Sequence, residues 1–384
     1  MDIDKQILIN WRRYLHMHPE ISGEEKDTAE YIYSILRSFG LQVENHIAGY
    51  GVMAVLPGNP AKKCAAIRAD MDALPIDEET QLEFRSRCGG KMHACGHDAH
   101  VAMALGAVKL LCANPPQGTV KFIFQPREEK PPGGARFMIE AGVLKNPDVD
   151  GIFGTHVVTD LRPGVIGIHD GATMSLDDTF SIAIVGQGGH GAQPHKTVDN
   201  IVVAAQVISA LQHISSRRID TFDPLVITIG SIHGGNRHNI IPDRVEMNGT
   251  IRCFSDEIDM NVRQCIEETV AGITSAYGAS YELKFHDGYP PLVNDPSLDL
   301  LVADAATLAG AEVEILQKAR MTAEDFAFYG KYVPAAFFFT GAGSERCCYP
   351  LHNSHFDIEE DGMPFGAKTL ANAAFALANQ DKKR

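Results

Sequence analysis

The chain has 384 residues, of which 45% are hydrophobic and 22% charged, as in soluble globular proteins. This length exceeds what one ordinary core supports, so we expect two domains. A formal net charge of −15 argues against nucleic-acid or anionic-membrane binding as the main task. We recognise neither an export signal nor a run approaching the ~20 apolar residues of a membrane helix, and the eight cysteines are scattered. We therefore expect a cytoplasmic protein with reduced thiols.

The first forty residues predict two helices. Apolar residues recur at helical spacing on both sides of Pro19, and the second helix is expected to end at Gly40. His16 and His18 lie beside the predicted turn without an acidic residue at ligand spacing. We expect both to be structural.

Short strands then alternate with helices. This order predicts an α/β domain with a largely parallel central sheet and helices on both faces. Chemically competent side chains follow the expected carboxyl ends of the strands, where open α/β sheets place their sites. The expected strands span residues 41–46, 52–56, 64–69, 119–124 and 151–154, with helices after residue 97 and over 135–141.

From about residue 177 the pattern becomes β-α-β-β-α-β, the element order of a ferredoxin-like domain. A helix, a strand and a final helix follow over 298–309, 335–340 and 365–378. The simplest arrangement is a catalytic domain of residues 1–176 and 289–384 that carries an inserted domain of residues 177–288.

One stretch, Met92–His100, packs a thiol, three imidazoles and a carboxylate into nine residues. Cys95 and His97, two apart before a predicted helix, suggest a transition-metal site, although a buried thiol beside a capping cluster is an alternative. Other ligand-competent side chains follow later strands. Five such ligands would suit two adjacent metal ions. The candidates are Cys95, His97, Glu129, His156 and His352.

Glu128 and Glu129 form an acidic pair after a predicted strand. Neighbouring side chains in an extended segment point in different directions, so Glu129 can bind metal while Glu128 acts as the general base. The alternative is a solvated pair. Asp70 and Asp72 could orient a ligand imidazole or cap a turn, and Asp98 could orient a ligand or cap the following helix.

Three further candidates lie in the expected inserted domain. His190, among four glycines, could donate to an oxyanion, or it could decorate a flexible hairpin. Asn239 and Arg252 could together bind a substrate carboxylate, although an ordinary surface ion pair would equally explain Arg252. His195 we expect to be structural.

Five motifs in order resemble the metal-dependent amidohydrolases, and the resemblance runs from about Trp11 to Phe375. This group includes N-acyl-amino-acid amidohydrolases, hippurate hydrolases and indole-acetyl-amino-acid hydrolases, which are related to aminoacylase and carboxypeptidase G. The motifs are His93–Asp98, Gln125–Glu129, Gly154–His156, Gly188–Ala192 and Met321–Phe326.

The resemblance implies two divalent ions per subunit (zinc, manganese, cobalt or nickel) and an inserted lid domain that also mediates dimerisation. It assigns the five candidate ligands as metal ligands, Glu128 as general base and Asp72 as its supporting aspartate. It also implies that His190 reaches an active site, often that of the partner subunit. The implied substrate-binding residues are Asn239, Arg252 and Glu324.

Two positions depart from related sequences. Carboxypeptidase-like relatives have a histidine where this chain has Asp70, and an aspartate near the place of Cys95 and His97, which places the chain in a cysteine-ligand branch. Arg127 stands where many relatives have a small residue, and its charge could lower the pKa of the base or favour an acidic substrate.

The expected activity is hydrolysis of N-acyl-L-amino acids to a carboxylate and a free amino acid by a homodimer or homotetramer. Nucleic acid and membrane are not expected partners. A dipeptidase or carboxypeptidase is the nearest alternative. A structural zinc site in a non-catalytic binding protein is a more distant one, and Cys95 acting as a nucleophile with His97 is disfavoured, because residues two apart rarely orient in that way.

Overall fold

The computed structural model describes residues 2–382 and divides into two compact units. The first unit combines the chain up to Thr173 with Val293–Ala319 and the segment from Asp325 onward. The second unit comprises Met174–Leu292 and the short segment Arg320–Glu324. The borders therefore fall at 173/174 and 292/293, beside the expected 176/177 and 288/289.

The first unit is built on an eight-stranded sheet of order β1-β2-β4-β3-β5-β16-β6-β15. The central strands β4, β3, β5 and β16 run parallel, whereas β1–β2, β2–β4 and β16–β6 pair antiparallel. The strands are β1 (Gln42–Ile47), β2 (Gly51–Leu56), β3 (Cys64–Asp70), β4 (Thr119–Gln125), β5 (Gly151–Val158), β6 (Val165–Ile168), β15 (Glu312–Ile315) and β16 (Ala335–Gly341).

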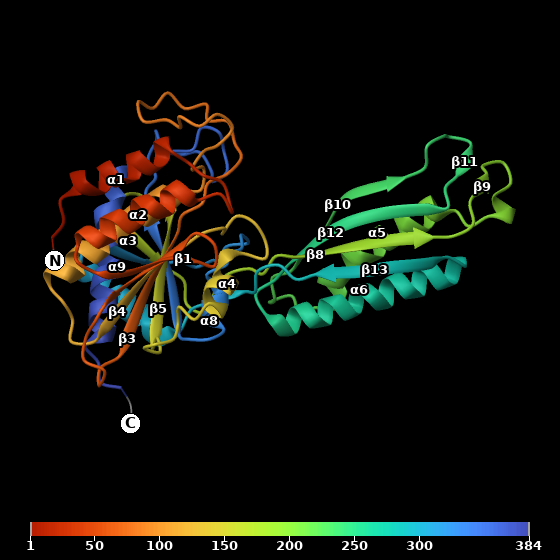
Figure 1. Cartoon of the computed structure of the whole chain (residues 1–384). Coiled ribbons are helices and arrows are strands. Elements are labelled where there is room, and N and C mark those ends of the chain that lie inside the picture. The colour runs from red at the N-terminus through yellow and green to blue at the C-terminus, as the bar shows by residue number, and fades with distance from the viewer. Residues whose placement is uncertain (1, 383–384) are drawn as a thin grey trace. The chain divides into compact units, whose positions relative to one another are not determined.

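Helices lie on both faces of this sheet, which confirms the predicted α/β class. Helices α1, α2, α3 and α9 lie on one side, and α4 and α8 lie on the other (Figure 1). The helices are α1 (Lys5–Met17), α2 (Lys26–Ser38), α3 (His97–Ala113), α4 (Gly134–Glu140), α7 (Pro296–Leu308), α8 (Ala327–Gly330), the 3-10 turn η2 (Glu360–Gly362) and α9 (Met363–Ala378).

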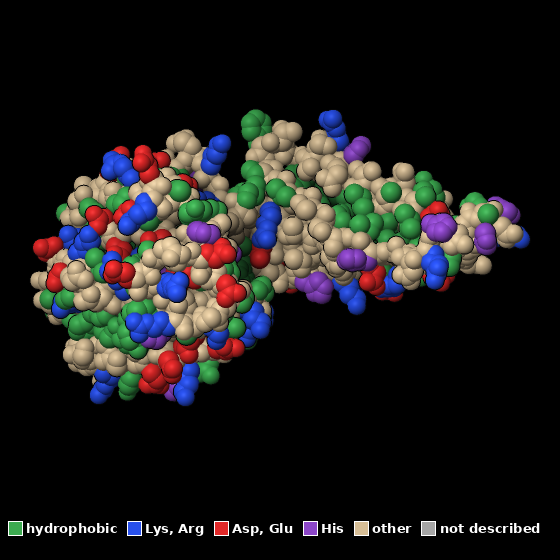
Figure 2. All heavy atoms as spheres, turned by 90° about the horizontal axis from the view of Figure 1, so that it is seen from above, with side chains coloured by type: hydrophobic (Ala, Val, Ile, Leu, Met, Phe, Trp, Pro, Cys, Tyr) green, Lys and Arg blue, Asp and Glu red, His purple; other side chains and the backbone are tan. Residues whose placement is uncertain are grey.

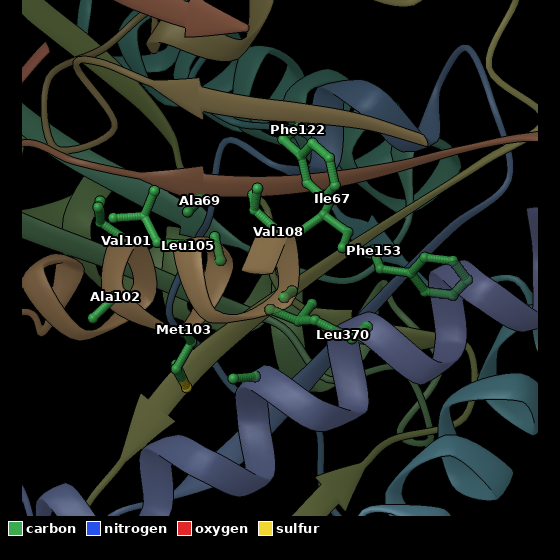
Figure 3. Packing of buried hydrophobic residues seen from close by; sticks show 14 of the residues in the cluster. Ile67, Ala69, Val101, Ala102, Met103, Leu105, Val108, Phe122, Phe153 and Leu370 are labelled. Carbon is green, nitrogen blue, oxygen red and sulfur yellow. The ribbon is translucent and has the colours of Figure 1, made fainter. Parts of the chain in front are cut away.

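Helix α3 is the centre of the first unit's core. Nearly every residue from His97 to Leu111 is buried, because strands pack against one side of the helix and α1 and α9 against others. Figure 3 shows Val108 of α3 near Ile67 of β3, Val101 and Leu105 toward Ala69 of the same strand, and Leu370 of α9 on another side. A Cβ atom at Gly106 would lie 2.7 Å from a methyl group of Leu8 and 3.0 Å from Ala367. The glycine therefore lets α1 and α9 approach α3 closely.

The second unit has the element order β8-α5-β10-β12-α6-β13, the β-α-β-β-α-β pattern expected from the sequence. Its antiparallel sheet has the order β10-β12-β8-β13 and buries alternate residues against α5 and α6. The elements are β8 (Asp178–Val185), β9 (Gly189–His190), η1 (Pro194–Lys196), α5 (Asn200–Arg217), β10 (Val226–Gly234), β11 (Ile240–Ile241), β12 (Arg244–Arg252), α6 (Asp256–Tyr277) and β13 (Ser280–His286).

Several short strands escaped the sequence analysis. These are β6, β9, β11 and β15, together with β7 (Ala172–Met174) and β14 (Leu292–Val293), which pair with each other. In addition, β5 continues to Val158, so His156 lies within this strand and not beyond its end as expected. The sheet supplies its hydrogen bonds from neighbouring strands, which the local pattern around Thr155 does not reveal.

Charged side chains of both signs are interspersed on the surface (Figure 2). On the face seen in Figure 2, acidic and basic side chains alternate over the first unit, and no broad basic patch is visible there among the described residues. Among residues 2–382, no helix combines the length and apolar character needed to cross a bilayer.

Candidate metal centre

The five candidate ligands meet near the carboxyl ends of the central strands of the first unit's sheet. Gly96, with φ 87°, turns the chain into α3 between Cys95 and His97, and a Cβ atom there would lie 2.4 Å from Val157. His352 also has a left-handed backbone (φ 65°), and its N–H donates to the carbonyl oxygen of Ala94 at 2.8 Å. This hydrogen bond joins the C-terminal ligand loop to the cysteine loop. A backbone hydrogen bond thus brings His352 close to Cys95, although the two residues are far apart in the sequence.

The donor atoms form two overlapping sets. One set comprises Cys95, His97 and His156, and the other comprises Cys95, Glu129 and His352, with the donor atoms of each set within 4.8 Å of one another. Cys95 Sγ lies 3.4 Å from His156 Nε2, and His352 Nε2 lies 3.2 Å from Glu129 Oε1. A donor that belongs to both sets suits two neighbouring cations.

Backbone contacts fix which nitrogen each imidazole presents. His97 Nδ1 lies 2.8 Å from the carbonyl oxygen of Asp72, and His156 Nδ1 lies 2.7 Å from that of Val157. A carbonyl accepts only from a protonated nitrogen, so both rings present Nε2 toward the centre. His97 Nε2 and Glu129 Oε1 are buried and have no hydrogen-bond partner among the described residues. Two buried donor atoms that lack a hydrogen bond and lie near the Cys95 thiol are suited to bind a cation.

The local charges also favour a cation. Burial raises the pKa of the Cys95 thiol well above its usual range, and Glu129 and Glu128 add to that effect. Burial opposes the charge on His97, but Asp70, Asp72 and Glu129 outweigh it and raise its pKa to about 10. A bound divalent ion would reverse both tendencies by stabilising the thiolate and the neutral imidazole.

Asp72 binds the backbone of the acidic pair, Glu128 and Glu129. Its two carboxylate oxygens accept the backbone N–H groups of Glu128 and Glu129, each at 3.0 Å. Burial opposes its charge, but hydrogen bonds from His97, Ser22 and the Glu129 N–H outweigh burial and lower the pKa of Asp72. Glu128 itself is 6% exposed, with its carboxylate near His97 and Glu129. It is a buried member of the cluster, unlike the solvated pair considered as the alternative.

The other residues of the nine-residue stretch face elsewhere. Asp98 caps the N–H of Ala99 and pairs with Arg12 and His16, so it does not orient a ligand imidazole. His93 is buried, and neither ring nitrogen has a partner among the described residues.

A buried network of side chains extends from Asp70, the one member that the sequence predicted to orient a ligand. His100 Nδ1 lies 2.6 Å from Asp70, and its Nε2 accepts the N–H of Val157, next to His156. Arg68 joins Asp70 to Asp325 through two ion pairs at 2.9 and 2.6 Å. A lone arginine inside an apolar strand was a further signal for this network, since a buried charge needs a partner.

The guanidinium of Arg127 contacts Phe137 and Pro131. It lies over the ring of Phe137 at 5.7 Å and donates to the carbonyl oxygen of Pro131. These contacts test neither of the two roles considered for this cation, which both stay predictions.

His190 and Asn239 lie together in the second unit. Strand β9 pairs with β11, which places His190 opposite Ile240, and the Gly191 N–H donates to the Asn239 carbonyl oxygen at 2.9 Å. His190 is exposed, and its Nδ1 accepts the Ala192 N–H at 3.0 Å, so its proton sits on Nε2. The ring thus presents a donor to solvent.

Arg252 does not join them. It ends β12, and Asn239 lies beyond the other end of that strand, roughly 25 Å away at ~3.3 Å per residue. Strand β12 therefore separates the two residues within one copy of the chain, and their shared role at a substrate carboxylate stays a prediction. Arg252 lies 3.4 Å from Asp177. Glu324 is 2% exposed and belongs to the segment that groups with the second unit.

Comparison with known proteins identifies similar hydrolases. The profile of peptidase family M20/M25/M40 matches residues 66–376. An N-acyl-L-amino acid amidohydrolase of Geobacillus stearothermophilus is 46% identical over 296 residues, which cover 77% of this chain and 80% of that protein. Thermostable carboxypeptidase 1 of Saccharolobus solfataricus is 40% identical over 98% of this chain and 96% of its own.

A solved structure extends the comparison to three dimensions. A dinuclear metal-binding peptidase of the M20 family from Bacillus subtilis matches with a TM-score of 0.87 and 34% identity, covering 98% of this chain and 99% of that one. The resemblance inferred from the five motifs is confirmed. A centre for two divalent metal ions is supported by this relative and by the overlapping donor sets.

Proposed function

The chain belongs to peptidase family M20/M25/M40, and from this premise we propose that it hydrolyses N-acyl-L-amino acids to a carboxylate and a free amino acid. The observation that carries the proposal is the pair of donor sets that share Cys95, with the buried carboxylate of Glu128 beside them. Similarity to an N-acyl-L-amino acid amidohydrolase over most of both chains supports the substrate class.

Cys95, His97, Glu129, His156 and His352 would hold the metal ions. A borderline-soft donor set of thiolate, imidazole and carboxylate suits zinc, manganese, cobalt or nickel. When bound, two divalent ions supply Lewis-acid polarisation of a carbonyl and a lowered pKa for water.

Glu128 would move the proton. Its carboxylate is buried next to the ligands, and its main chain is fixed by Asp72, so it can take a proton from the attacking water. Protonated Glu128 then donates to the leaving nitrogen. Asp72 acts through the backbone of residues 128 and 129 and through the His97 ring.

The second unit would supply substrate contacts as a lid and dimerisation domain. His190, protonated on Nε2, can donate to the developing oxyanion, and Asn239 stands beside it. Arg252 offers a partly exposed guanidinium for the substrate carboxylate, and Glu324 would line the site. Because Arg252 lies at the opposite end of β12, we assign the two groups of residues to different copies of a homodimer or homotetramer.

A hydrolysis screen on metal-reconstituted protein tests the proposal. We expect turnover of N-acetyl- and N-benzoyl-L-amino acids, and at most slow cleavage of unblocked dipeptides. Preferential cleavage of dipeptides would indicate an exopeptidase instead. Dipeptides are included in the screen because the chain is also similar to a carboxypeptidase. Chelation should remove the activity and largely preserve the circular dichroism spectrum. Unfolding on chelation would indicate a structural metal site and contradict the proposal.

A further inference from the structure

The loop that carries the acidic pair has a second buried anchor. Glu25, at the start of α2, is fully buried, and its Oε1 accepts the backbone N–H of Arg127 at 2.8 Å. Its other oxygen has no hydrogen-bond partner among the described residues. No step of the proposed reaction uses this carboxyl group.

Three consecutive N–H groups are thereby held by two buried carboxyl groups. The N–H of Arg127 donates to Glu25, and those of Glu128 and Glu129 donate to Asp72. Pro126 precedes them and has no N–H to donate. The path of the chain into the acidic pair is therefore set first by Glu25 and then by Asp72.

The backbone of Arg127 needs such an anchor. Its φ of 63° is left-handed, a conformation that costs a residue with a side chain on the order of 1 kcal/mol. This turn allows the next two N–H groups to reach the two oxygens of Asp72. If residue 127 relaxed to negative φ, both following amides would change direction, and with them the carboxylates of Glu128 and Glu129.

We propose that Glu25 is a positioning residue for the metal centre, which fixes Glu128 and Glu129 by accepting the N–H of Arg127 in its left-handed turn. Burial raises the pKa of Glu25 to about 7, and the charge of Asp72 adds to that effect. Either protonation state leaves an oxygen that can accept, so the role depends on reach and not on charge. The kinetic part of the inference rests on the proposed function, whereas its metal-binding part does not.

Two substitutions separate reach from charge. Glu25→Asp keeps the carboxylate but withdraws it by one methylene, and Glu25→Gln keeps an acceptor oxygen at full length without the charge. We expect Glu25→Asp to lower kcat roughly 10- to 100-fold with KM nearly unchanged, because a displacement of about 1 Å misplaces the base. Glu25→Gln should stay within about threefold of the natural protein.

A neighbouring residue provides the control. Glu20 accepts the N–H groups of Asp27 and Thr28 at the start of the same helix but does not contact residues 127–129. Glu20→Ala should lower the melting temperature without lowering kcat. The inference would be overturned if Glu25→Asp kept the kcat of the natural protein. It would also be overturned if Glu25→Gln or Glu20→Ala lowered kcat as much as Glu25→Asp does.

Metal affinity gives a readout that does not depend on turnover. Competition with a chelator should show Co²⁺ or Zn²⁺ bound about tenfold more weakly by Glu25→Asp, because Glu129 moves with the loop. Glu25→Gln and Glu20→Ala should bind the ion normally. If the natural protein hydrolyses no N-acyl amino acid, the proposed function fails, and these affinities still decide on Glu25.

Discussion

At the scale of single residues, the candidate metal centre contains imidazoles that are oriented by hydrogen bonds to the backbone, without any metal ion. His97 and His156 each use Nδ1 to donate to a backbone carbonyl, so their Nε2 atoms face Cys95 and Glu129 without rotation. Binding then costs little side-chain entropy, since the rings are already buried and oriented. The cost is paid in electrostatics, as the burial of Cys95 disfavours its thiolate until a cation arrives.

Substitutions of the acidic pair separate catalysis from metal binding. We expect Glu128→Ala to lower turnover by at least ~10³-fold while metal content stays intact, since a general base is lost but no ligand. Glu129→Ala, one residue away, should lose metal as well as activity. Metal analysis by mass spectrometry beside a rate assay checks both. Full activity or loss of metal in Glu128→Ala would disprove the base assignment.

At the scale of elements, α1 is joined to α3 by buried charges. Arg12, on the face of α1 that enters the core, pairs with Asp98 in the first turn of α3 and with Asp357 and Glu360 near the C-terminal ligand loop. His16, one turn further along, lies 2.7 Å from Asp98 and 3.4 Å from Glu78. The network thus connects the two segments that carry Cys95 and His352.

This network makes stability depend on pH. Burial opposes the charge on His16, but Asp98 and Glu78 outweigh it and raise its pKa to about 9, above an ordinary value of 6.5. A raised pKa means that the stabilisation is complete below about pH 6.5 and is lost as the pH rises through 9. A difference of this size corresponds to a contribution on the order of 3 kcal/mol.

Chemical denaturation at pH 6 and pH 9.5 measures this contribution. We expect the free energy of unfolding to fall over this range in the natural protein and to fall by less in His16→Gln, in which the raised pKa of His97 still contributes a decrease. His18→Gln is the matched control, because His18 contacts only the carbonyl oxygen of Tyr14 and the Tyr14 ring. Parallel pH profiles for His16→Gln and the natural protein would contradict the assignment.

At the scale of the whole molecule, the second unit separates groups that one substrate would need. His190 and Asn239 lie at one end of β12, and Arg252 lies at the other. A rigid strand of nine residues cannot bring these ends to one small ligand. The proposed assembly resolves this by letting each active site draw residues from two copies of the chain.

Complementation between inactive variants tests the assembly. Glu128→Ala and His190→Ala should each be inactive alone, but after unfolding and joint refolding about a quarter of the sites should recover, because half of the dimers are mixed and each has one intact site. Glu128→Ala mixed with Asp72→Ala should stay inactive, since both residues serve the same subunit's site. No recovery in the first mixture would place His190 in its own subunit's site.

Much of the centre could be predicted because its chemistry is local in sequence. Cys95 and His97 are two apart, and Glu128 and Glu129 are adjacent, so residue type and spacing singled them out as candidate ligands and base, and the structure brings them together. The supporting residues could not be found in this way. Glu25 and Arg127 are 102 positions apart, and Arg12 and Asp98 are 86 apart, with no periodic pattern that relates them.

The sequence by itself determined the α/β class, the element order of the inserted segment and the family, because hydrophobic periodicity and short motifs depend on neighbouring residues. Only the tertiary structure decided which carboxyl group holds which loop, that Asp98 faces Arg12 and His16, and that β12 separates Asn239 from Arg252. Those outcomes depend on buried hydrogen bonds and strand length, which form between distant parts of the chain once the core has packed.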